Sequence, residues 1–252
     1  NGRLPLLAPM SEVAGRMSIQ AAAHHLEKAN GGRALLLAGV PGVPAAEVVI
    51  LGAGVVGSAA LQMAVGMGSR VTIIDKNLDR LRELDALYGN RIHTLYSSTA
   101  NIERSVINAD VVIGSVLVPG GAAPKLVTRR MVSAMKSGSV IVDVAIDQGG
   151  CIETSRMTTH DEPVYKVHDI IHYCVPNIAS RVARTASYSL SNIFTPIVLQ
   201  MADLRGAEEM IFNYKWFLRG VYTYRGSLTN AYLGRKFGLN HKELQLLLAA
   251  RY

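Results

Sequence analysis

The chain has 252 residues, 49% of them apolar and 18% charged, and this composition excludes a disordered protein. Its formal charge is +7, but the nine basic side chains of residues 183–252 show no RNP-like or zinc-finger spacing, so we expect no nucleic-acid binding. Two cysteines are too few for a disulfide framework or a cysteine-rich zinc site. We therefore expect a reducing, cytoplasmic setting.

The first predicted helix covers residues 11–29, with Ser11 as its N-cap after Pro9 and apolar residues at helical spacing. Two prolines and two glycines then interrupt the apolar segment 33–47, which is expected to be a structured linker. Residues 48–69 lack any charge and are long enough to span a membrane. Five glycines and Gln62 interrupt this stretch, so we interpret it as a strand and a buried helix and expect no membrane association.

From residue 48 onward, apolar runs alternate with helical patterns. The alternation predicts an α/β fold with a doubly wound, Rossmann-type parallel sheet. The predicted strands are 48–51, 71–74, 111–116, 139–144 and 168–173, and the predicted helices lie near 55–67, 77–87, 101–108 and 128–135.

The pattern changes after Arg184. A long helical segment, 185–204, contains Pro196, which is expected to kink or break the helix. Shorter helices are predicted near 207–218 and 241–250, and no comparable strand pattern is found there. The tail is therefore expected to pack outside the sheet.

The strand at 48–51 runs directly into a G-x-G-x-x-G turn made by Gly52, Gly54 and Gly57. Such a turn lets backbone approach a pyrophosphate and places it at a helix N-terminus. Asp75 follows Gly57 by 18 residues, close to the usual offset of the acid that binds the ribose hydroxyls. These features predict NAD rather than NADP as cofactor, although Lys76 weakens the distinction; the alternative is a plain glycine turn beside a solvated Asp.

A second group of acidic residues lies in VIVDVAIDQGG, residues 140–150. Asp147 lies just beyond the apolar run, at the strand end where such sheets bind ligands, and is a candidate catalytic residue. The alternative is a turn-forming Asp. Asp143, within the run, is expected to be a hydrogen-bonded structural group. The seven histidines show no metal-ligand spacing, so no metal is expected.

Several segments between Leu4 and Tyr173 resemble the NAD-dependent alanine dehydrogenases, which are related to the NAD(H)-binding subunit of proton-translocating transhydrogenase. The segments that carry this resemblance are LPLLAPMSEVAGRM, GGRALLLAGVPGV, VVILGAGVVG, VLVPGGAAPKLV and VIVDVAIDQGGCIETSRMTTHDEPVY. The transhydrogenase shares the glycine turn but typically differs at APMSEVAG and DVAIDQGG.

The resemblance implies a protomer of two lobes and a truncated N-terminus, since the chain opens with Asn1. Residues 1–8 would end a substrate lobe, 9–182 would form the NAD-binding domain with a crossing helix, and 183–252 would return helically to the incomplete substrate lobe. The Arg, Lys and His that hold and protonate substrate would belong to the preceding segment. The chain alone is therefore expected to be inactive, and the complete protein to be a homohexamer.

The resemblance also assigns individual positions. Met10 would lie near the substrate, and Asp147 would be the catalytic acid. The implied cofactor contacts are Ser11, Asp75, Arg80, Ser97, Val116, Leu117, Val144, Ala145, Ile146, Arg156, Val175, Pro176, Asn177 and Ile178, beside the turn glycines. Ile178 stands where many members have Met, and the VARTASYSLSN segment and the final 50 residues also differ from many members.

The implied activity is the reversible oxidative deamination of L-alanine to pyruvate and ammonium. Two alternatives remain: the NAD(H)-binding subunit of a transhydrogenase, and a non-catalytic NAD-binding module.

Overall fold

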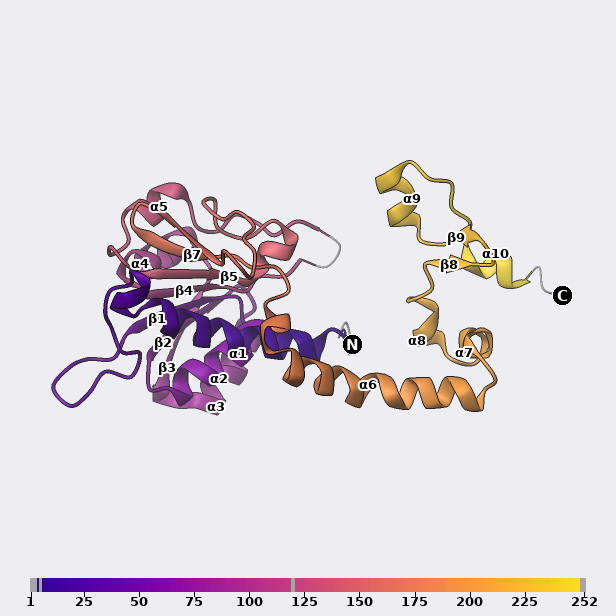
Figure 1. Cartoon of the computed structure of the whole chain (residues 1–252), viewed down its shortest axis with the longest axis horizontal. Helices are drawn as coiled ribbons and strands as arrows, with labels where there is room; N and C mark the ends of the chain where they lie inside the picture. The colour runs from indigo at the N-terminus through magenta and orange to yellow at the C-terminus, as the bar shows by residue number, and fades with distance from the viewer. Residues whose placement is uncertain (1–3, 5, 119–120, 250–252) are drawn as a thin grey trace. The chain divides into compact units, whose positions relative to one another are not determined.

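The computed structural model describes residues 4, 6–118 and 121–249 (Figure 1). It divides into two units, residues 1–190 and 191–252. Part of the expected lobe segment 1–8, namely residues 1–3 and 5, lies outside the described residues, as do Pro119 and Gly120.

A seven-stranded sheet forms the centre of the first unit. The strand order is β3-β2-β1-β4-β5-β7-β6, and every neighbouring pair is parallel except β6 and β7. The bounds are β1 Glu47–Leu51, β2 Arg70–Asp75, β3 Ile92–Tyr96, β4 Val111–Gly114, β5 Val140–Asp143, β6 Val164–Val167 and β7 Ile170–Tyr173. The predicted doubly wound α/β fold is confirmed, whereas β3 and the antiparallel β6 were not predicted.

Helices connect these strands close to where the sequence pattern places them. They are α2 Val55–Gly66, α3 Leu78–Tyr88, α4 Thr99–Asn108 and α5 Arg129–Ser133. Short polar side chains begin three of them: Asn77 caps α3, Ser98 caps α4 and Thr128 caps α5, each by accepting backbone N–H groups of the first turn.

Helix α1 runs from Ala8 to His25, so it begins earlier than predicted. Ser11 is not the N-cap: Leu7 precedes the helix, and the N–H of Ser11 already donates to the Leu7 carbonyl. Pro9 fits the first turn because a proline lacks an N–H that would have no partner there. Further along, Gly15 lets α1 approach α2 closely, since a Cβ on Gly15 would lie 2.2 Å from the Val56 carbonyl oxygen.

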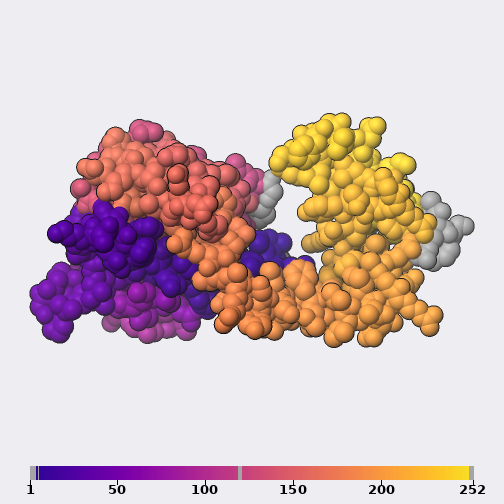
Figure 2. Space-filling view, in the orientation of Figure 1, coloured from indigo at the N-terminus to yellow at the C-terminus, as the bar shows by residue number. Residues whose placement is uncertain are grey.

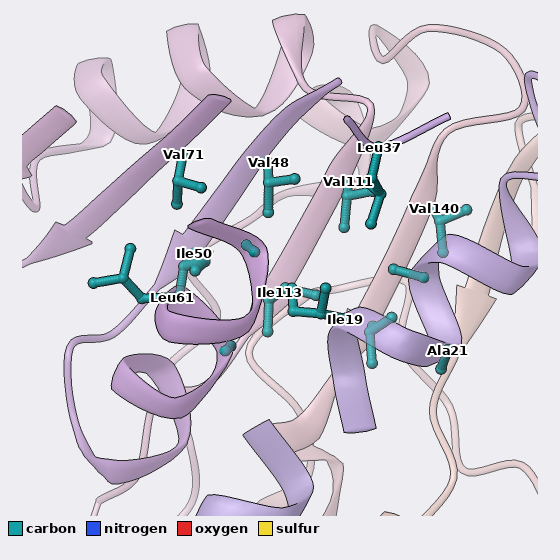
Figure 3. Close-up of a cluster of buried hydrophobic side chains, with 14 of the residues drawn as sticks. Ile19, Ala21, Leu37, Val48, Ile50, Leu61, Val71, Val111, Ile113 and Val140 are labelled. Carbon is teal, nitrogen blue, oxygen red and sulfur yellow. The ribbon is translucent and has the colours of Figure 1, made fainter. Parts of the chain in front are cut away.

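Alternate residues of the strands point to opposite faces of the sheet. Val48 and Ile50 of β1 join a buried cluster with side chains of α1 and α2, including Ile19 and Leu61 (Figure 3). Val49 and Leu51 join a second cluster on the other face, which includes residues of α4 and α5. Burial on both faces explains why these strands are continuous apolar runs.

The predicted linker 33–47 forms a loop that projects from the sheet (Figures 1 and 2). Val40 and Val43 pair across its tip through two backbone hydrogen bonds of 3.1 and 2.7 Å. Both side chains are exposed.

Helix α6, Ala183–Asp203, continues through Pro196, so of the two expected outcomes, a kink or a break, the break is wrong. Pro196 and Asn192, whose carbonyl loses its helical partner, are both exposed, and water can bond the freed carbonyl. The second unit continues with α7 Ala207–Asn213, α8 Lys215–Leu218, β8 Thr223–Tyr224, β9 Ser227–Leu228, α9 Ala231–Phe237 and α10 Leu244–Ala249. Among the described residues, no helix is long and apolar enough to cross a bilayer.

Candidate functional site

Two adjoining cavities open at the carboxyl ends of the parallel strands, where the strand order reverses between β1 and β4. Their volumes are about 660 and 310 Å³. We call them the glycine-turn cavity and the Asp147 cavity. Both are lined by Leu7, Ser11, Val56, Ser115, Val116 and Leu117, so they form one continuous site.

Each of the three turn positions has a different structural reason to be glycine. Gly52 has a φ of +100°, a conformation that favours glycine. Gly57 brings helix α2 onto the turn, because a Cβ there would lie 1.8 Å from the Gly52 carbonyl oxygen. A Cβ on Gly54 would meet no heavy atom within 4 Å, and this residue lines the larger cavity, so a ligand can approach its backbone directly.

Helix α2 points its N-terminus at this cavity. Its N-cap is Gly54, which supplies no side-chain hydrogen bond, and Val55 and Val56 of the first turn line the cavity. The uncapped N–H groups and the positive end of the helix dipole suit an anionic phosphate. The residues present therefore fit a pyrophosphate at this place.

Asp75 ends β2 and lines the glycine-turn cavity. Its Oδ2 accepts the Ala53 N–H at 2.6 Å, and its Oδ1 accepts the Asn77 N–H at 2.7 Å. Each carboxylate oxygen can accept a further hydrogen bond, so the ribose hydroxyls remain possible donors. A carboxylate at this position would repel the 2′-phosphate of NADP, so the site favours NAD.

Arg80 supports the glycine turn through hydrogen bonds to Ala53 and Ser58. Its Nε donates to the Ala53 carbonyl at 3.1 Å and its Nη2 donates to Ser58 Oγ at 2.8 Å. Arg80 is not among the residues that line either cavity, whereas Ser97, at the end of β3, lines the larger one. Ala53 is thus held at its N–H by Asp75 and at its carbonyl by Arg80.

The short helix η3, Val144–Gln148, forms part of the wall of the smaller cavity. Val144, Ala145, Asp147 and Gln148 line it, and the Asp147 side chain is exposed. Ile146 points into the protein and is buried, so it does not line the cavity.

Asp143 is the buried structural group that its place within β5 predicted. Only 1% of the residue is exposed, and its carboxylate accepts the N–H groups of Cys151 and Ile152 and the hydroxyl of Ser155. Burial raises the pKa of this carboxyl, and the hydrogen bonds from Ser155, Cys151 and Ile152 oppose that rise.

Two other segments complete the lining of the Asp147 cavity. Met10 and Ser11 reach the Asp147 cavity from the first turns of α1. Val175 and Asn177 reach it from the segment between β7 and η4, Ile178–Val182, and Ile178 reaches it from the start of η4. Asn177 has a φ of +50°. Pro176 belongs to the same segment but is not among the lining residues.

Arg156 lies outside both cavities. Its guanidinium stacks on the Tyr165 ring, 4.1 Å from the ring centre, and its backbone N–H donates to the Tyr165 hydroxyl at 2.7 Å. The predicted positions therefore line the two cavities, with the exceptions of Gly57, Arg80, Ile146, Arg156 and Pro176.

Ser115 belongs to the site although it was not predicted. It follows β4 directly, and its Oγ donates to the Leu51 carbonyl at 2.8 Å. The available indication was its place near the carboxyl end of the predicted strand 111–116, the end where such sheets bind ligands. Gln148 was also missed; its side-chain oxygen accepts the Val118 N–H at 3.1 Å and ties η3 to the loop after β4.

Known proteins resemble this chain in sequence and in fold. The family model "Alanine dehydrogenase/PNT, C-terminal domain" matches residues 18–231. The chain is 51% identical over 247 residues to an alanine dehydrogenase of Halomonas elongata, covering 98% of this chain and 66% of that protein. A solved L-alanine dehydrogenase superposes with a TM-score of 0.90 at 46% identity, covering 94% of this chain and 65% of that one.

A transhydrogenase from Sinorhizobium meliloti is more distant, with a TM-score of 0.67 and 29% identity over 78% of this chain and 55% of that one. The chain spans about two thirds of the length of the alanine dehydrogenases it matches. These matches confirm NAD as the predicted cofactor. The chain belongs to the alanine dehydrogenase/PNT family.

Proposed function

We propose that this chain forms the NAD-binding part of an alanine dehydrogenase, which interconverts L-alanine with pyruvate and ammonium. The observation that carries the proposal is the pair of adjoining cavities, one built on the glycine turn and the other on Asp147. Bound NAD would accept the hydride that leaves the Cα of the substrate. The protein's own residues supply binding, orientation and proton handling.

The glycine-turn cavity would hold the dinucleotide. The backbone at Gly54 and the N-terminus of α2 would bind the pyrophosphate, and Asp75 would accept the ribose hydroxyls. Ser11, Val116 and Leu117 line both cavities, so they would contact the cofactor where it passes from one cavity to the other.

The Asp147 cavity would hold the reacting end. Asp147 would order the catalytic water or ammonia and hold the nicotinamide end, with Met10 near the substrate and Asn177 and Ile178 lining the same cavity. We further propose that a segment outside residues 1–252 supplies the groups that hold the substrate carboxylate, and that the complete protein is a homohexamer.

The proposal is tested by three measurements. Calorimetric titration should detect NAD binding to residues 1–252, and the protein expressed from its complete coding region should form NADH from L-alanine. Asp147→Asn should lower kcat by roughly a hundredfold, the size typical of losing a general acid or base. It should weaken NAD binding much less, because the contacts proposed for the pyrophosphate and the ribose are made by other residues. Absence of NAD binding would overturn the proposal, and rapid alanine oxidation by residues 1–252 alone would contradict the division between two segments.

The transhydrogenase alternative is supported by the Sinorhizobium meliloti match, at lower identity and lower coverage than the alanine dehydrogenase matches. It predicts hydride exchange between two nicotinamide nucleotides without any need for L-alanine. NAD binding without turnover by the complete protein would favour a non-catalytic module instead.

A further inference from the structure

The turn that carries Asp147 is closed at its base by Asp143. This residue immediately precedes η3, and its carboxylate reaches across to the residues that end the turn: Oδ2 accepts the Cys151 N–H at 3.0 Å and the Ile152 N–H at 3.3 Å. Ser155 Oγ donates to the same oxygen at 2.6 Å. The segment 144–152, which we call the Asp147 turn, therefore starts and ends at one buried carboxylate.

Lys125 holds the other side of the same turn. Its Nζ donates to the Gly149 carbonyl at 2.6 Å, the Gly150 carbonyl at 2.9 Å and the Ile152 carbonyl at 3.4 Å. An ammonium group has three N–H donors, so these three carbonyls use all of them. The carboxylate thus binds the N–H groups of the turn, and the ammonium binds its carbonyls.

The surroundings allow the turn little freedom to shift. Gly149 and Gly150 both have positive φ values, +89° and +76°. A Cβ on Gly150 would lie 2.6 Å from Asp143 Oδ2, and one on Gly114 would lie 2.8 Å from Oδ1, so the carboxylate is enclosed by glycines. The Leu126 N–H also donates to the Cys151 carbonyl at 2.7 Å, which fixes the segment next to Lys125 against the turn.

Neither Lys125 nor Asp143 lines a cavity, but the turn between them carries two residues that do, Asp147 and Gln148. We propose that Lys125 is a positioning residue that, together with Asp143, clamps the Asp147 turn from two sides and keeps Asp147 in its cavity. This inference rests on the function proposed for Asp147. Charge-assisted hydrogen bonds suit the task, because they are shorter and stronger than neutral ones.

Lys125 is the better residue to change, because it is exposed and Asp143 is buried. In the protein from the complete coding region, Lys125→Met should lower kcat about tenfold, since small displacements of a reacting group are costly. The dissociation constant for NAD should stay within about twofold, because the glycine turn lies on other elements. Equal losses in kcat and NAD affinity would overturn the positioning role.

Lys166→Met is the matched control. Lys166 is also exposed, and its Nζ also donates to a backbone carbonyl, that of Gly31, at 3.1 Å, but it lines neither cavity. The control loses the same charge and should keep the wild-type kcat. If the two variants lose the same activity, the loss comes from charge alone and the clamp is wrong.

A second measurement does not depend on activity. In residues 1–252, Lys125→Met should speed amide hydrogen exchange at residues 149–152 about tenfold, with no change in β1 or α2. Unchanged exchange there would overturn the clamp. Should the wild-type protein fail to oxidise L-alanine, the proposed function fails, and this exchange experiment still decides whether Lys125 holds the turn.

Chemical rescue tests whether the ammonium group of Lys125 is what holds the Asp147 turn. The chain has two cysteines, Cys151 and Cys174, and both are fully buried. Lys125→Cys can therefore be alkylated selectively with 2-bromoethylamine, which restores an ammonium at nearly the original length. Alkylation should return the slow exchange of residues 149–152, and exchange that stays fast after complete alkylation would contradict the assignment.

Discussion

The two units of the chain bury their apolar side chains to different extents. In the first unit, side chains on both faces of the sheet form two buried clusters. In the described part of the second unit, the buried hydrophobic residues are Met210, Ile211 and Tyr224. Its exposed large apolar residues are Phe194, Val198, Leu199, Phe212, Trp216, Tyr222, Tyr232, Phe237, Leu239 and Leu246.

This difference in burial suggests that the first unit can bind the cofactor alone, whereas the second unit needs a packing partner. The first unit has its own core and both cavities, so cofactor binding should depend on it alone. A surface as apolar as that of the second unit is uncommon on monomers. We therefore expect residues 191–252 to pack against a further segment of the protein or a neighbouring subunit.

The largest effect is expected for Gly57→Ala, which tests whether the first unit's turn creates the cofactor site. The new Cβ would lie 1.8 Å from the Gly52 carbonyl oxygen, so the turn or α2 must move, and NAD affinity should fall by roughly a hundredfold. Gly66→Ala is the control, because it lies in the same helix with nothing within 4 Å. Equal NAD affinities of the two variants in calorimetry would contradict this account.

The core of the first unit also predicts an acid-sensitive stability. Burial, the neighbouring His24 and Arg181 lower the pKa of His25 to about 4, so the unfolded chain binds this proton more readily than the folded one. The free energy of unfolding should be constant above about pH 6.5 and fall by up to about 3 kcal/mol as the pH drops to 4.

His172 contributes in the same direction, because burial lowers its pKa as well. His25→Phe should therefore reduce the pH slope without abolishing it. The measurement is urea unfolding between pH 4 and 8 on residues 1–190. A slope equal to that of the wild-type sequence would remove His25 as a cause.

A smaller effect is expected for Asp75→Ala, which should weaken NAD binding about tenfold more than NADP binding, because only NAD offers both adenosine ribose hydroxyls. Asp75→Asn sharpens the result. Its amide oxygen can still accept the Ala53 N–H, so it keeps support of the turn while removing the charge. Unchanged NAD affinity in Asp75→Ala would rule out the ribose assignment.

The smallest effect on cofactor binding is expected from truncation after Leu190. Residues 1–190 should keep NAD affinity within about twofold, because both cavities lie within that unit.

Light scattering on the protein from the complete coding region should show an oligomer, and loss of residues 191–252 should disrupt it. Assembly that survives the truncation would show that the tail does not mediate it.

Much of the sheet could be predicted because its central strands are buried on both faces. Runs such as 48–51 and 111–113 are apolar throughout, and the glycine turn follows the first of them directly. Strand β3 was missed because it lies at the sheet edge, where His93 is exposed and Thr94 only partly buried. An edge strand needs only one apolar neighbour, so its sequence pattern is weaker.

The site was predictable where a residue's position follows from a strand end, as for Asp75 and Asp147. It was not predictable where side chains reach a turn from another segment. Lys125 and Gly149 are 24 residues apart in the chain, and nothing in the residues around Lys125 indicates that three carbonyls surround its ammonium. Likewise, Arg156 stacks on Tyr165, a contact formed by tertiary packing.

The close approach of α1 and α2 at Gly15 has a consequence for engineering the pocket. Ser11 lies one helical turn before Gly15 and Val56 lies opposite, and both residues line both cavities. The width of the site thus depends on a contact made by backbone atoms outside it. A library that randomises only cavity-lining side chains leaves the distance between α1 and α2 fixed. A single methyl group added at position 15 would change that distance. Every substitution in the cavity would then act on a site of different width.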